Sequence, residues 1–394
     1  MKYFLWPALV FFICMASCGD AEKGTGFIPE TGVQEALKLN EQIRLSEFLT
    51  RIEYVRLETT ATGLVRPNSG IYLTDNHIIT INSRQCLLFD RKSGDFLREL
   101  GRRGRGPGEY SVATSGFLNE NRSEIYFLGS ERSLICYSLD GSFVGTVKLP
   151  VTESSFGLGN LSYLNDSVYV LHHINATGVE STLISFFDKN GNVLGTVPNP
   201  HKTDEHPLTV VAGEVRFHHV KKKLLFADNY NDTVFQLEPG VISPHFIFNR
   251  GSACPTFESR FWDYERSINS SYIMHPFYLE TEYYILGTFF VNQSRHFLFH
   301  NKKTGLRKIS KLPDGLINDL DGSMPFEFTS VNNAGTEIAC IIDAGEILAW
   351  LSSNKSKYDK ISKEFMELED LTSNANPVVI IGYVSTSSKG LHPR

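Results

Sequence analysis

The chain has 394 residues, of which 41% are hydrophobic and 12% aromatic, enough apolar side chains to build a sizeable core. Its 38 Lys and Arg residues stand against 44 Asp and Glu residues, which gives a net charge of -6. Nucleic-acid-binding proteins carry a basic excess or a basic stripe, so nucleic acid is excluded as the expected partner. The length alone suggests two or three domains, although an all-β fold often uses as many residues in one domain.

The N-terminus predicts an exported lipoprotein. Lys2 precedes the apolar run Tyr3–Cys14, an order that is typical of a secretory signal peptide, and the run is too short to span a membrane. The next residues, Met15–Cys18, resemble the lipobox of bacterial lipoproteins. We therefore expect residues 1–17 to be removed and Cys18 to carry the acyl chains of a stable membrane anchor. The alternative, that the apolar run is a strand of the fold, is weaker because the residues that follow are polar.

Residues 18–50 are expected to form a flexible tether between the lipid and the fold. They contain Gly24, Gly26, Pro29 and Gly32, and the stretch from 33 to 49 has only a weak apolar stripe.

Four cysteines lie beyond the signal and the anchor, namely Cys86, Cys136, Cys254 and Cys340. They lack Cys-x-x-Cys spacing, so neither a zinc site nor a redox motif is predicted. An exported compartment permits disulfides, but three of the four cysteines lie in apolar, strand-like runs. We expect these three to be buried free thiols.

From residue 51 onward the sequence repeats one hairpin pattern. A strand-like run, a turn rich in Asp, Asn and Gly, and a second run recur, which is the short-range signal of a β-hairpin. The three clearest copies cover residues 86–100, 136–147 and 184–197, and looser copies begin at 234 and 297. The copies lie about 50 residues apart, with one longer interval before the last, and such a period is the signature of a repeat fold.

Two further runs precede each hairpin, so each repeat contains four strands, as in a β-propeller blade. Repeats at 71–100, 116–147, 161–197, 213–248 and 277–309 account for five blades, and 328–350 supplies a sixth. The remaining runs, Ile52–Thr59 and Val378–Val384, are expected to meet in the last blade, because a ring must remove its terminal edges.

We therefore predict an all-β fold, a six-bladed β-propeller of four-stranded antiparallel blades over residues 51–386, closed by its N- and C-terminal strands. Five or seven blades remain alternatives. A short surface helix is expected over Lys355–Leu371, where apolar residues follow helical spacing, and a disordered tail over 387–394.

Two segments carry a family resemblance. The first is Gly101–Tyr110, which reads Gly-Arg-Arg-Gly-Arg-Gly-Pro-Gly-Glu-Tyr, and the second is Asn376–Ile380. Both resemble the six-bladed β-propeller lipoproteins of Bacteroidetes, which are of NHL/TolB-like type. The resemblance implies a propeller in the cell envelope, as an outer-membrane lipoprotein that faces the periplasm or is exposed at the cell surface. It implies no catalytic residue.

Candidate ligand-binding residues follow from the predicted ring, whose channel is lined by the first strand of each blade. Near these strands lie Arg66, Glu109, Glu214, Arg216, His275 and Glu327. The glycine-rich loop 101–110 is expected to be a crossover between blades with positive φ angles, and contact with an anion through Arg105 is the alternative. Trp262 and Tyr272 belong to an aromatic-rich insertion that either stacks on a ligand or packs against a blade.

No catalytic or metal-binding residue is predicted. The pairs His172-His173 and His218-His219 lie inside strands, where adjacent side chains point to opposite faces, so neither pair can hold one metal ion through both rings. A divalent metal in the channel would need oxygen ligands, and no motif supports it, so we expect no cofactor. Neither Gly-x-Ser-x-Gly nor His-Glu-x-x-His occurs in the sequence.

These observations favour a monomeric, lipid-anchored, non-catalytic binding module for a glycan, a peptide or a partner protein. One alternative is an enzyme with its site in the channel, either a metal-dependent lactonase or a glycan hydrolase or lyase. The other is a structural subunit of an outer-membrane uptake complex.

Overall fold

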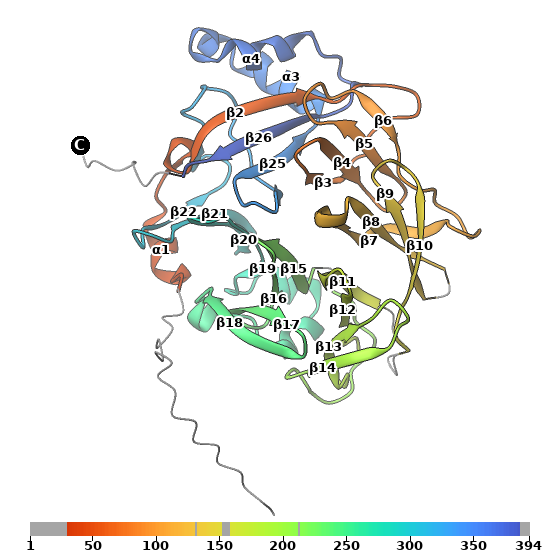
Figure 1. The fold of residues 1–394 in the computed structure, drawn as a ribbon. Helices are drawn as coiled ribbons and strands as arrows, with labels where there is room; N and C mark the ends of the chain where they lie inside the picture. Colours follow the sequence, from red (N-terminus) through yellow and green to blue (C-terminus); the bar gives the residue numbers. More distant parts are fainter. Residues whose placement is uncertain (1–29, 131, 152–157, 212, 387–394) are drawn as a thin grey trace, which may run out of the picture.

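A computed structural model of the chain describes residues 30–130, 132–151, 158–211 and 213–386. Within these ranges six four-stranded antiparallel sheets surround a central axis, so the protein is a six-bladed β-propeller (Figure 1). The predicted fold class is confirmed, and the alternatives of five and seven blades are wrong. Cys18 and the tail 387–394 lie outside the described residues.

The first five blades follow the chain, and each runs from its innermost to its outermost strand. Blade 1 contains β3 (Gly70–Leu73), β4 (His77–Ile81), β5 (Cys86–Asp90) and β6 (Phe96–Glu99). Blade 2 contains β7 (Tyr110–Asn119), β8 (Glu124–Gly129), β9 (Ser133–Ser138) and β10 (Phe143–Lys148). Blade 3 contains β11 (Leu158–Asn165), β12 (Val168–His173), β13 (Thr182–Phe187) and β14 (Val193–Pro198). Blade 4 contains β15 (Val215–Val220), β16 (Lys223–Asp228), β17 (Thr233–Glu238) and β18 (Val241–Ile247). Blade 5 contains β19 (Met274–Glu280), β20 (Tyr284–Val291), β21 (Ser294–Asn301) and β22 (Arg307–Lys311).

Blade 6 closes the ring with strands from both ends of the chain. From the axis outward it contains β24 (Ser330–Val331), β25 (Glu337–Ile342), β26 (Val378–Val384) and β2 (Leu49–Arg56). Strand β2 pairs antiparallel with β26, from Leu49 opposite Val384 to Arg56 opposite Val378. The closure predicted from the two unassigned runs is therefore confirmed.

Aspartates explain why the outer hairpins recur so clearly in the sequence. The Asp90 carboxylate accepts hydrogen bonds from the backbone N–H groups of Lys92 and Ser93, at 2.9 and 2.8 Å. Asp140 and Asp188 cap the equivalent turns of blades 2 and 3 in the same way. Hydrogen bonds from the turn residues lower the pKa of all three carboxyl groups below the usual range.

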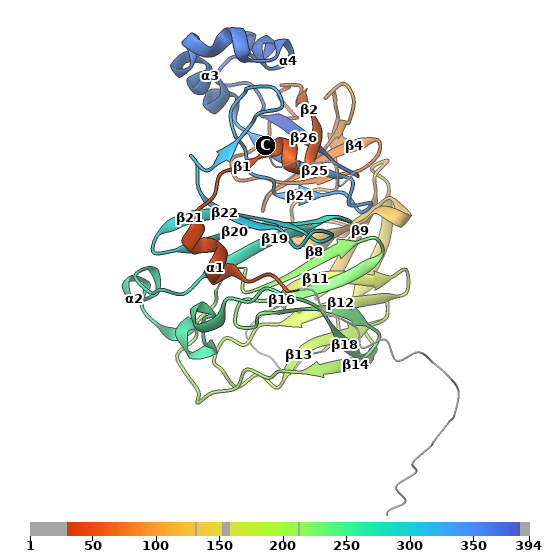
Figure 2. The same cartoon turned by 90° about the vertical axis from the view of Figure 1, so that its left-hand side faces the viewer.

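The segment before β2 is folded onto the ring. It forms α1 (Val33–Leu39), β1 (Ile43–Arg44) and the 3-10 helix η1 (Leu45–Glu47). Helix α1 lies beside β22, and β1 pairs in parallel with β23 (Leu316–Ile317) (Figures 1 and 2). Val33, Ile43 and Phe48 are fully buried. The prediction of a flexible tether over 18–50 is therefore wrong from residue 30 onward, because these few apolar side chains pack against blades 4, 5 and 6.

Helices interrupt blade 6 between β25 and β26. They are α3 (Ala344–Ser353), η5 (Lys355–Lys360), α4 (Lys363–Met366) and η6 (Glu367–Asp370), and they lie outside the ring (Figure 1). The interpretation of 328–350 as blade strands is wrong for its last part, since Trp350 lies in α3. The single helix predicted over Lys355–Leu371 is instead three short helical segments. A second insertion, between β18 and β19, contains η3 (Gly251–Ala253), η4 (Phe257–Phe261) and α2 (Tyr264–Ile268).

The cysteines of the described part form no disulfide, and Cys86, Cys136 and Cys340 are buried, as predicted. Cys254 is partly exposed. None of the helices in the described ranges combines the length and the apolar character needed to span a membrane.

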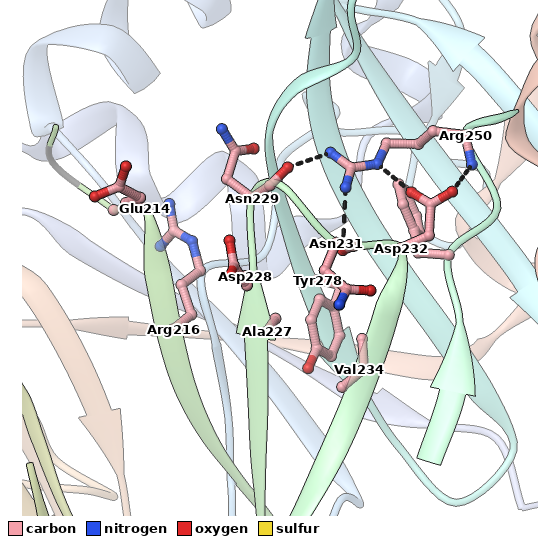
Figure 3. Close-up of a pocket in the computed structure, with 12 residues that line it drawn as sticks. Glu214, Arg216, Ala227, Asp228, Asn229, Asn231, Asp232, Val234, Arg250 and Tyr278 are labelled. Carbon is pink, nitrogen blue, oxygen red and sulfur yellow. Dashed lines mark hydrogen bonds and ion pairs between the residues drawn. The ribbon is translucent and has the colours of Figure 1, made fainter. Parts of the chain in front are cut away.

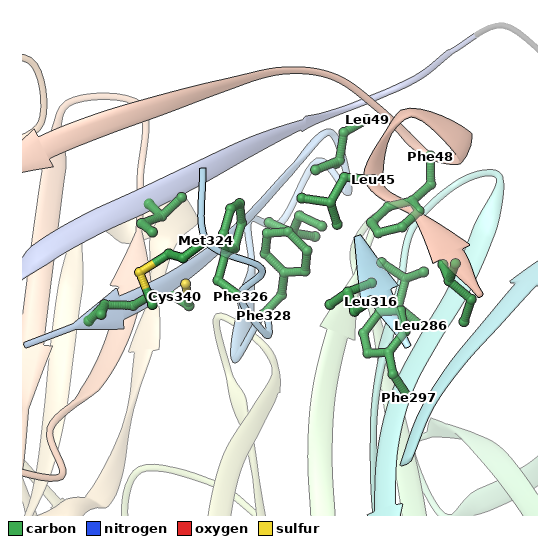
Figure 4. Packing of buried hydrophobic residues seen from close by; sticks show 14 of the residues in the cluster. Leu45, Phe48, Leu49, Leu286, Phe297, Leu316, Met324, Phe326, Phe328 and Cys340 are labelled. Carbon is green, nitrogen blue, oxygen red and sulfur yellow. The ribbon is translucent and has the colours of Figure 1, made fainter. Parts of the chain in front are cut away.

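The largest apolar cluster lies where the closing strand meets blades 5 and 6 (Figure 4). The Phe48 ring lies at its centre, with ring centroids of Tyr284, Phe297, Phe299 and Phe328 between 5.8 and 6.3 Å away. Because Phe48 directly precedes β2, this packing holds the closing strand in place.

Replacing Phe48 with Ala should therefore destabilise the whole ring. The lost apolar contacts and the remaining cavity should lower the free energy of unfolding by about 3–5 kcal/mol. Leu194→Ala is a matched control, because that β14 side chain is 56% exposed and its loss should change stability by no more than about 0.5 kcal/mol. Urea denaturation measures both, and similar small effects of the two variants would contradict the role given to Phe48.

Candidate functional site

One end of the ring carries a wide polar cavity of about 1000 Å³, which we call the mouth. It is lined by the turns between the first and second strands of every blade except the fifth, by the strand ends beside those turns, and by Leu139 from the β9–β10 turn of blade 2. The lining residues are Thr74–His77, Glu120, Asn121, Ser123, Leu139, Tyr163–Asp166, His219, Lys221, Lys222 and Asn332–Ala334. Because each of these turns comes from a different blade, only the closed ring brings them together.

The β24–β25 turn of blade 6 reaches across this end of the channel. The backbone O atom of Asn333 accepts a hydrogen bond from the Lys221 N–H of blade 4, at 3.0 Å. Asn333 also acts on Glu120 of blade 2 and on Tyr163 of blade 3, since it lowers the pKa of both groups. One turn therefore connects three blades on the other side of the axis and forms the floor of the mouth.

Glu120 is the electrostatically unusual group of the mouth. Burial raises the pKa of its carboxyl group to about 7, and the nearby Asp75 carboxylate acts in the same direction, while the Asn333 hydrogen bond opposes the shift. The cations on the opposite side are Lys221, whose Nζ lies 2.7 Å from the Glu282 carboxylate, and Lys222. Glu120 therefore changes between a neutral and a charged hydrogen-bonding group near neutral pH.

A second cavity of about 350 Å³ lies along the inner strands, and we call it the channel cavity. It is lined by Tyr72, Gly116, Phe117, Asn160–Ser162, Arg216–His219, Phe277 and Tyr278, so the first strands line the channel as predicted. His219 lines both the mouth and the channel cavity. The two cavities are therefore neighbours along the axis.

Ser162 and His219 form a hydrogen-bonded pair in the channel, with 3.0 Å between Oγ and Nε2. A nucleophilic serine needs a histidine that is itself oriented and supported by a third group. Within the described ranges His219 stacks on Tyr163 and has no bonded carboxylate. Burial lowers the pKa of His219 to about 4, so the ring is neutral at physiological pH. The arrangement suits ligand binding better than nucleophilic attack.

The sequence-predicted ligand residues do not form one site. Arg216 lines the channel cavity. Arg66 is exposed before β3 and donates through Nε to Gln85 at 3.1 Å. Glu327 forms an ion pair with Arg295 of blade 5 at 2.7 Å. His275 lies in β19, and its side chain is outside the described part of the structure.

Glu214 is engaged in a buried ion pair. Its two carboxylate oxygens accept hydrogen bonds from Nε and a terminal nitrogen of Arg260, at 2.6 and 2.8 Å, and the Arg260 side chain is 0% exposed. Arg260 belongs to the insertion between β18 and β19. Nearby, Arg250 pairs with Asp232 at 2.7 Å (Figure 3). These two ion pairs hold the insertion to blade 4. Because the partners in each pair are not neighbours in the sequence, no local sequence pattern predicts that they meet.

The aromatic candidates of the insertion contact each other. The rings of Trp262 and Tyr272 stack with centroids 5.5 Å apart, and the Arg266 guanidinium lies 3.8 Å from the Trp262 ring centroid. The rings therefore pack within the insertion.

The glycine-rich loop is a crossover from blade 1 to blade 2, as expected. Gly101 has a φ of 67°, and a Cβ atom there would lie 2.8 Å from the Tyr137 ring. The Glu109 carboxylate accepts a hydrogen bond from the Gly106 N–H at 2.8 Å and so closes the loop on itself. Arg105 is exposed and lines a separate groove on the outside of blade 2, away from the channel.

The described residues contain no group of three or more His, Cys, Asp and Glu side chains arranged to hold a metal ion. Sequence reasoning missed Glu120 and Asn333. The only signal for them was their place in turns between the first two strands of a blade.

The chain matches a family described as a domain of unknown function, DUF4934, over residues 30–383. The chain belongs to this family. The crystal structure of a proposed exported protein from Bacteroides fragilis is similar, with a TM-score of 0.68 and 16% sequence identity over 91% of this chain and 99% of that chain. At this identity the likeness shows a shared fold.

Two further solved structures are more distant. One is KlHsv2 with loop 6CD replaced by a Gly-Ser linker, with a TM-score of 0.32 and 10% identity over 62% of this chain and 70% of that chain. The other is the dihydro-heme d1 dehydrogenase NirN in complex with DHE, with a TM-score of 0.36 and 11% identity over 62% and 57% of the two chains. No curated protein is significantly similar to the chain in sequence.

Glu214→Gln should destabilise the protein strongly, because it leaves the buried Arg260 charge without its partner. We expect a loss of about 3–5 kcal/mol in the free energy of unfolding. The double variant Glu214→Leu/Arg260→Met removes both charges and should recover most of that loss. Lys221→Gln, which breaks a half-exposed ion pair, is the control and should cost less than about 1 kcal/mol. If Glu214→Gln is as stable as the wild type in urea, the ion pair does not hold the insertion.

Glu120 should make stability depend on pH. Its folded pKa of about 7 lies above its ordinary value of 4.5, so the native state holds the proton more tightly, and the wild type loses stability as pH rises through this window. Glu120→Gln cannot ionise. Its stability advantage over the wild type, measured as the difference in the free energy of unfolding, should be near zero at about pH 4. This difference should reach about 1–2 kcal/mol at about pH 8, a value that allows for partial exposure of the carboxyl group.

Urea denaturation at the two pH values measures this difference. The exposed Glu364 of α4 offers the control Glu364→Gln, which should differ from the wild type by no more than about 0.5 kcal/mol at either pH. An advantage of Glu120→Gln that is the same at both pH values would contradict the burial of an ionisable carboxyl group in the mouth.

Proposed function

We propose that this protein is a lipid-anchored propeller of the bacterial cell envelope that binds a glycan in the mouth of its ring and catalyses no reaction. The observation that carries the proposal is the cavity of about 1000 Å³, to which five blades contribute polar turn residues. This size lies at the upper end of the range for small-molecule sites and suits an oligosaccharide.

The chemistry of the mouth supports a ligand rich in hydroxyl groups. Each hydroxyl group both donates and accepts hydrogen bonds, and side-chain amides do the same, whereas carboxylates accept. The mouth offers five asparagines beside its carboxylates, namely Asn76, Asn121, Asn165, Asn332 and Asn333. Four of the lining residues, Leu139, Tyr163, Leu164 and Ala334, are apolar or aromatic, which leaves few side chains to anchor a peptide or a protein partner.

The envelope location rests on two supports. One is the resemblance of Met15–Cys18 to a lipobox at the end of an apolar N-terminal run. The other is the fold shared with a proposed exported protein from Bacteroides fragilis. Anchoring through Cys18 would keep the propeller at a membrane surface, where a channel mouth can meet glycans.

A second candidate function is glycan hydrolysis. Glycosidases use two carboxyl groups, one of which has a raised pKa and acts as the acid. Glu120, with a pKa of about 7 and Asp75 near it, fits the first part of that description. We favour binding because the Asn333 side chain engages Glu120 and makes it part of the floor of the mouth.

A panel of neutral and acidic oligosaccharides tests the proposal. The wild type should bind one or more of them, and Asn333→Ala, which removes an amide from the floor of the mouth, should weaken that binding about 2–10-fold, the usual worth of one or two hydrogen bonds. Asn190→Ala, in an outer turn of blade 3, should bind as the wild type does. Calorimetry measures the affinities.

The same samples, incubated and analysed by chromatography, separate the two candidate functions. Intact oligosaccharides support binding without catalysis. Shortened products that disappear with Glu120→Gln would establish hydrolysis instead, and a protein that binds none of the panel would contradict the proposal.

A further inference from the structure

The inner strands of blades 4 and 5 face each other across a set of polar side chains in the channel. In β15, Arg216 and His218 lie two residues apart and so point to the same side. The Arg216 guanidinium lies 5.2 Å from the Phe277 ring centroid, and the His218 ring lies 5.2 Å from the Tyr278 ring. Both β15 side chains therefore point toward β19 of blade 5.

Two of these groups are buried without a hydrogen-bond partner among the described residues. They are Nε of Arg216 and the phenolic oxygen of Tyr278. Tyr278 is only 5% exposed. Buried polar atoms in folded proteins are nearly always hydrogen-bonded, because an unmet group costs stability. Such atoms facing a cavity indicate a missing partner.

The Arg216 charge also lacks a counter-ion in the described structure. The nearest carboxylates along the same strands are already engaged. Glu214 is held by Arg260, and Glu280 lies 2.8 Å from His245 and 2.7 Å from Lys302. Burial lowers the pKa of the Arg216 guanidinium, yet arginine remains charged in proteins. The site therefore holds one uncompensated positive charge.

His218 adds a neutral donor. Its Nε2 accepts a hydrogen bond from the Glu280 N–H at 3.2 Å, which assigns the ring proton to Nδ1. Burial lowers the pKa of His218 to about 4, so the ring is uncharged at neutral pH. The facing strands thus present a guanidinium, a phenol and an imidazole N–H as donors, and the carboxylate that acts on His218 and Tyr278, that of Glu280, is already paired with His245 and Lys302.

We propose that Arg216, Tyr278 and His218 form an oxyanion subsite in the channel cavity that takes the carboxylate of an acidic sugar. One cationic and two neutral donors match a single negative charge, and a planar guanidinium matches the geometry of a carboxylate. The channel cavity of about 350 Å³ is close to the lower limit for a ligand site, so it suits one sugar ring.

This inference rests on the proposed function, because the sugar that enters the channel cavity belongs to the glycan bound in the mouth. His219 lines both cavities and marks where they adjoin. The aromatic rings of Phe117 and Phe277 line the channel cavity and offer apolar faces to the sugar ring. The bound glycan would then carry a uronic acid at the unit that reaches the channel.

A small cavity of about 20 Å³ beside the site supplies a competing explanation. Arg216 and Tyr278 line it as well (Figure 3), and its size suits a single water molecule. A buried water could satisfy both side chains without any ligand. The experiment must therefore separate a ligand subsite from a structural water.

Ligand-observed NMR with D-glucuronate and D-glucose provides the test on the full folded domain. The wild type should bind glucuronate about 10-fold or more tightly than glucose, as expected for a charge-assisted hydrogen bond. Arg216→Gln should abolish this preference, and Tyr278→Phe should weaken glucuronate binding about 2–10-fold. Arg66→Gln changes an exposed arginine outside both cavities and should leave the preference intact.

Thermal unfolding of the same variants is the second measurement. Both substitutions remove an unpaired buried group, so Arg216→Gln and Tyr278→Phe should unfold at the same temperature as the wild type or at a higher one. This result would show that a loss of binding is not a loss of folding. A fall in unfolding temperature without any change in glucuronate binding would assign the two groups to a structural water and overturn the subsite.

The remaining outcomes are distinct. Equal binding of glucuronate and glucose, or undiminished preference in Arg216→Gln, overturns the subsite and leaves neutral-glycan binding in the mouth untouched. Inorganic phosphate that displaces glucuronate with the same dependence on Arg216 overturns the assignment to a sugar carboxylate. Arg216-dependent glucuronate binding without binding of any oligosaccharide, neutral or acidic, supports the subsite and contradicts the proposed function of the mouth.

Discussion

The pairing of β2 with β26 is the interaction on which the rest of the structure depends. It joins residues 49–56 to 378–384 and so connects the two ends of the folded chain in one sheet. Without it, β26 would be an exposed, apolar edge strand, since Val378–Ile381 are fully buried. The Phe48 cluster stabilises this pairing from the side of blade 5. Both cavities exist because the ring is closed.

Closure also explains why polar groups gather near the axis. Each blade begins at the axis, and the turn after its first strand lies at one end of the channel. Side chains that are far apart in sequence, such as Glu120, Tyr163 and Asn333, therefore meet in the mouth. The inner strands contribute donors such as Arg216 to the channel cavity, where burial makes an unmatched charge more costly than it is at the surface. The donors that we propose to bind a ligand in the channel thus lower the stability of the ring while they have no partner.

Apart from the closure of the ring, the features predicted correctly from the sequence have local causes. Asp90, Asp140 and Asp188 cap tight turns through bonds to residues two to four positions away, so their hairpins are visible in any one repeat. The features missed have distant causes. Val33 and Ile43 are buried by blades that lie more than a hundred residues later in the chain, and the buried Glu214–Arg260 pair forms between blade 4 and an insertion.

The sequence by itself determined a repeated four-stranded unit of about 50 residues, and it favoured six copies whose two terminal strands meet. The unit follows from alternation and turn chemistry, which act over a few residues, and the closure follows from the need to pair the terminal edges of a ring. Only the tertiary structure decided which polar residues share a cavity. The reason is physical: the partner that neutralises a charge or meets a hydrogen bond comes from another blade, so Glu214 is engaged by Arg260 while Arg216, two residues later, faces the channel without a counter-ion in the described structure.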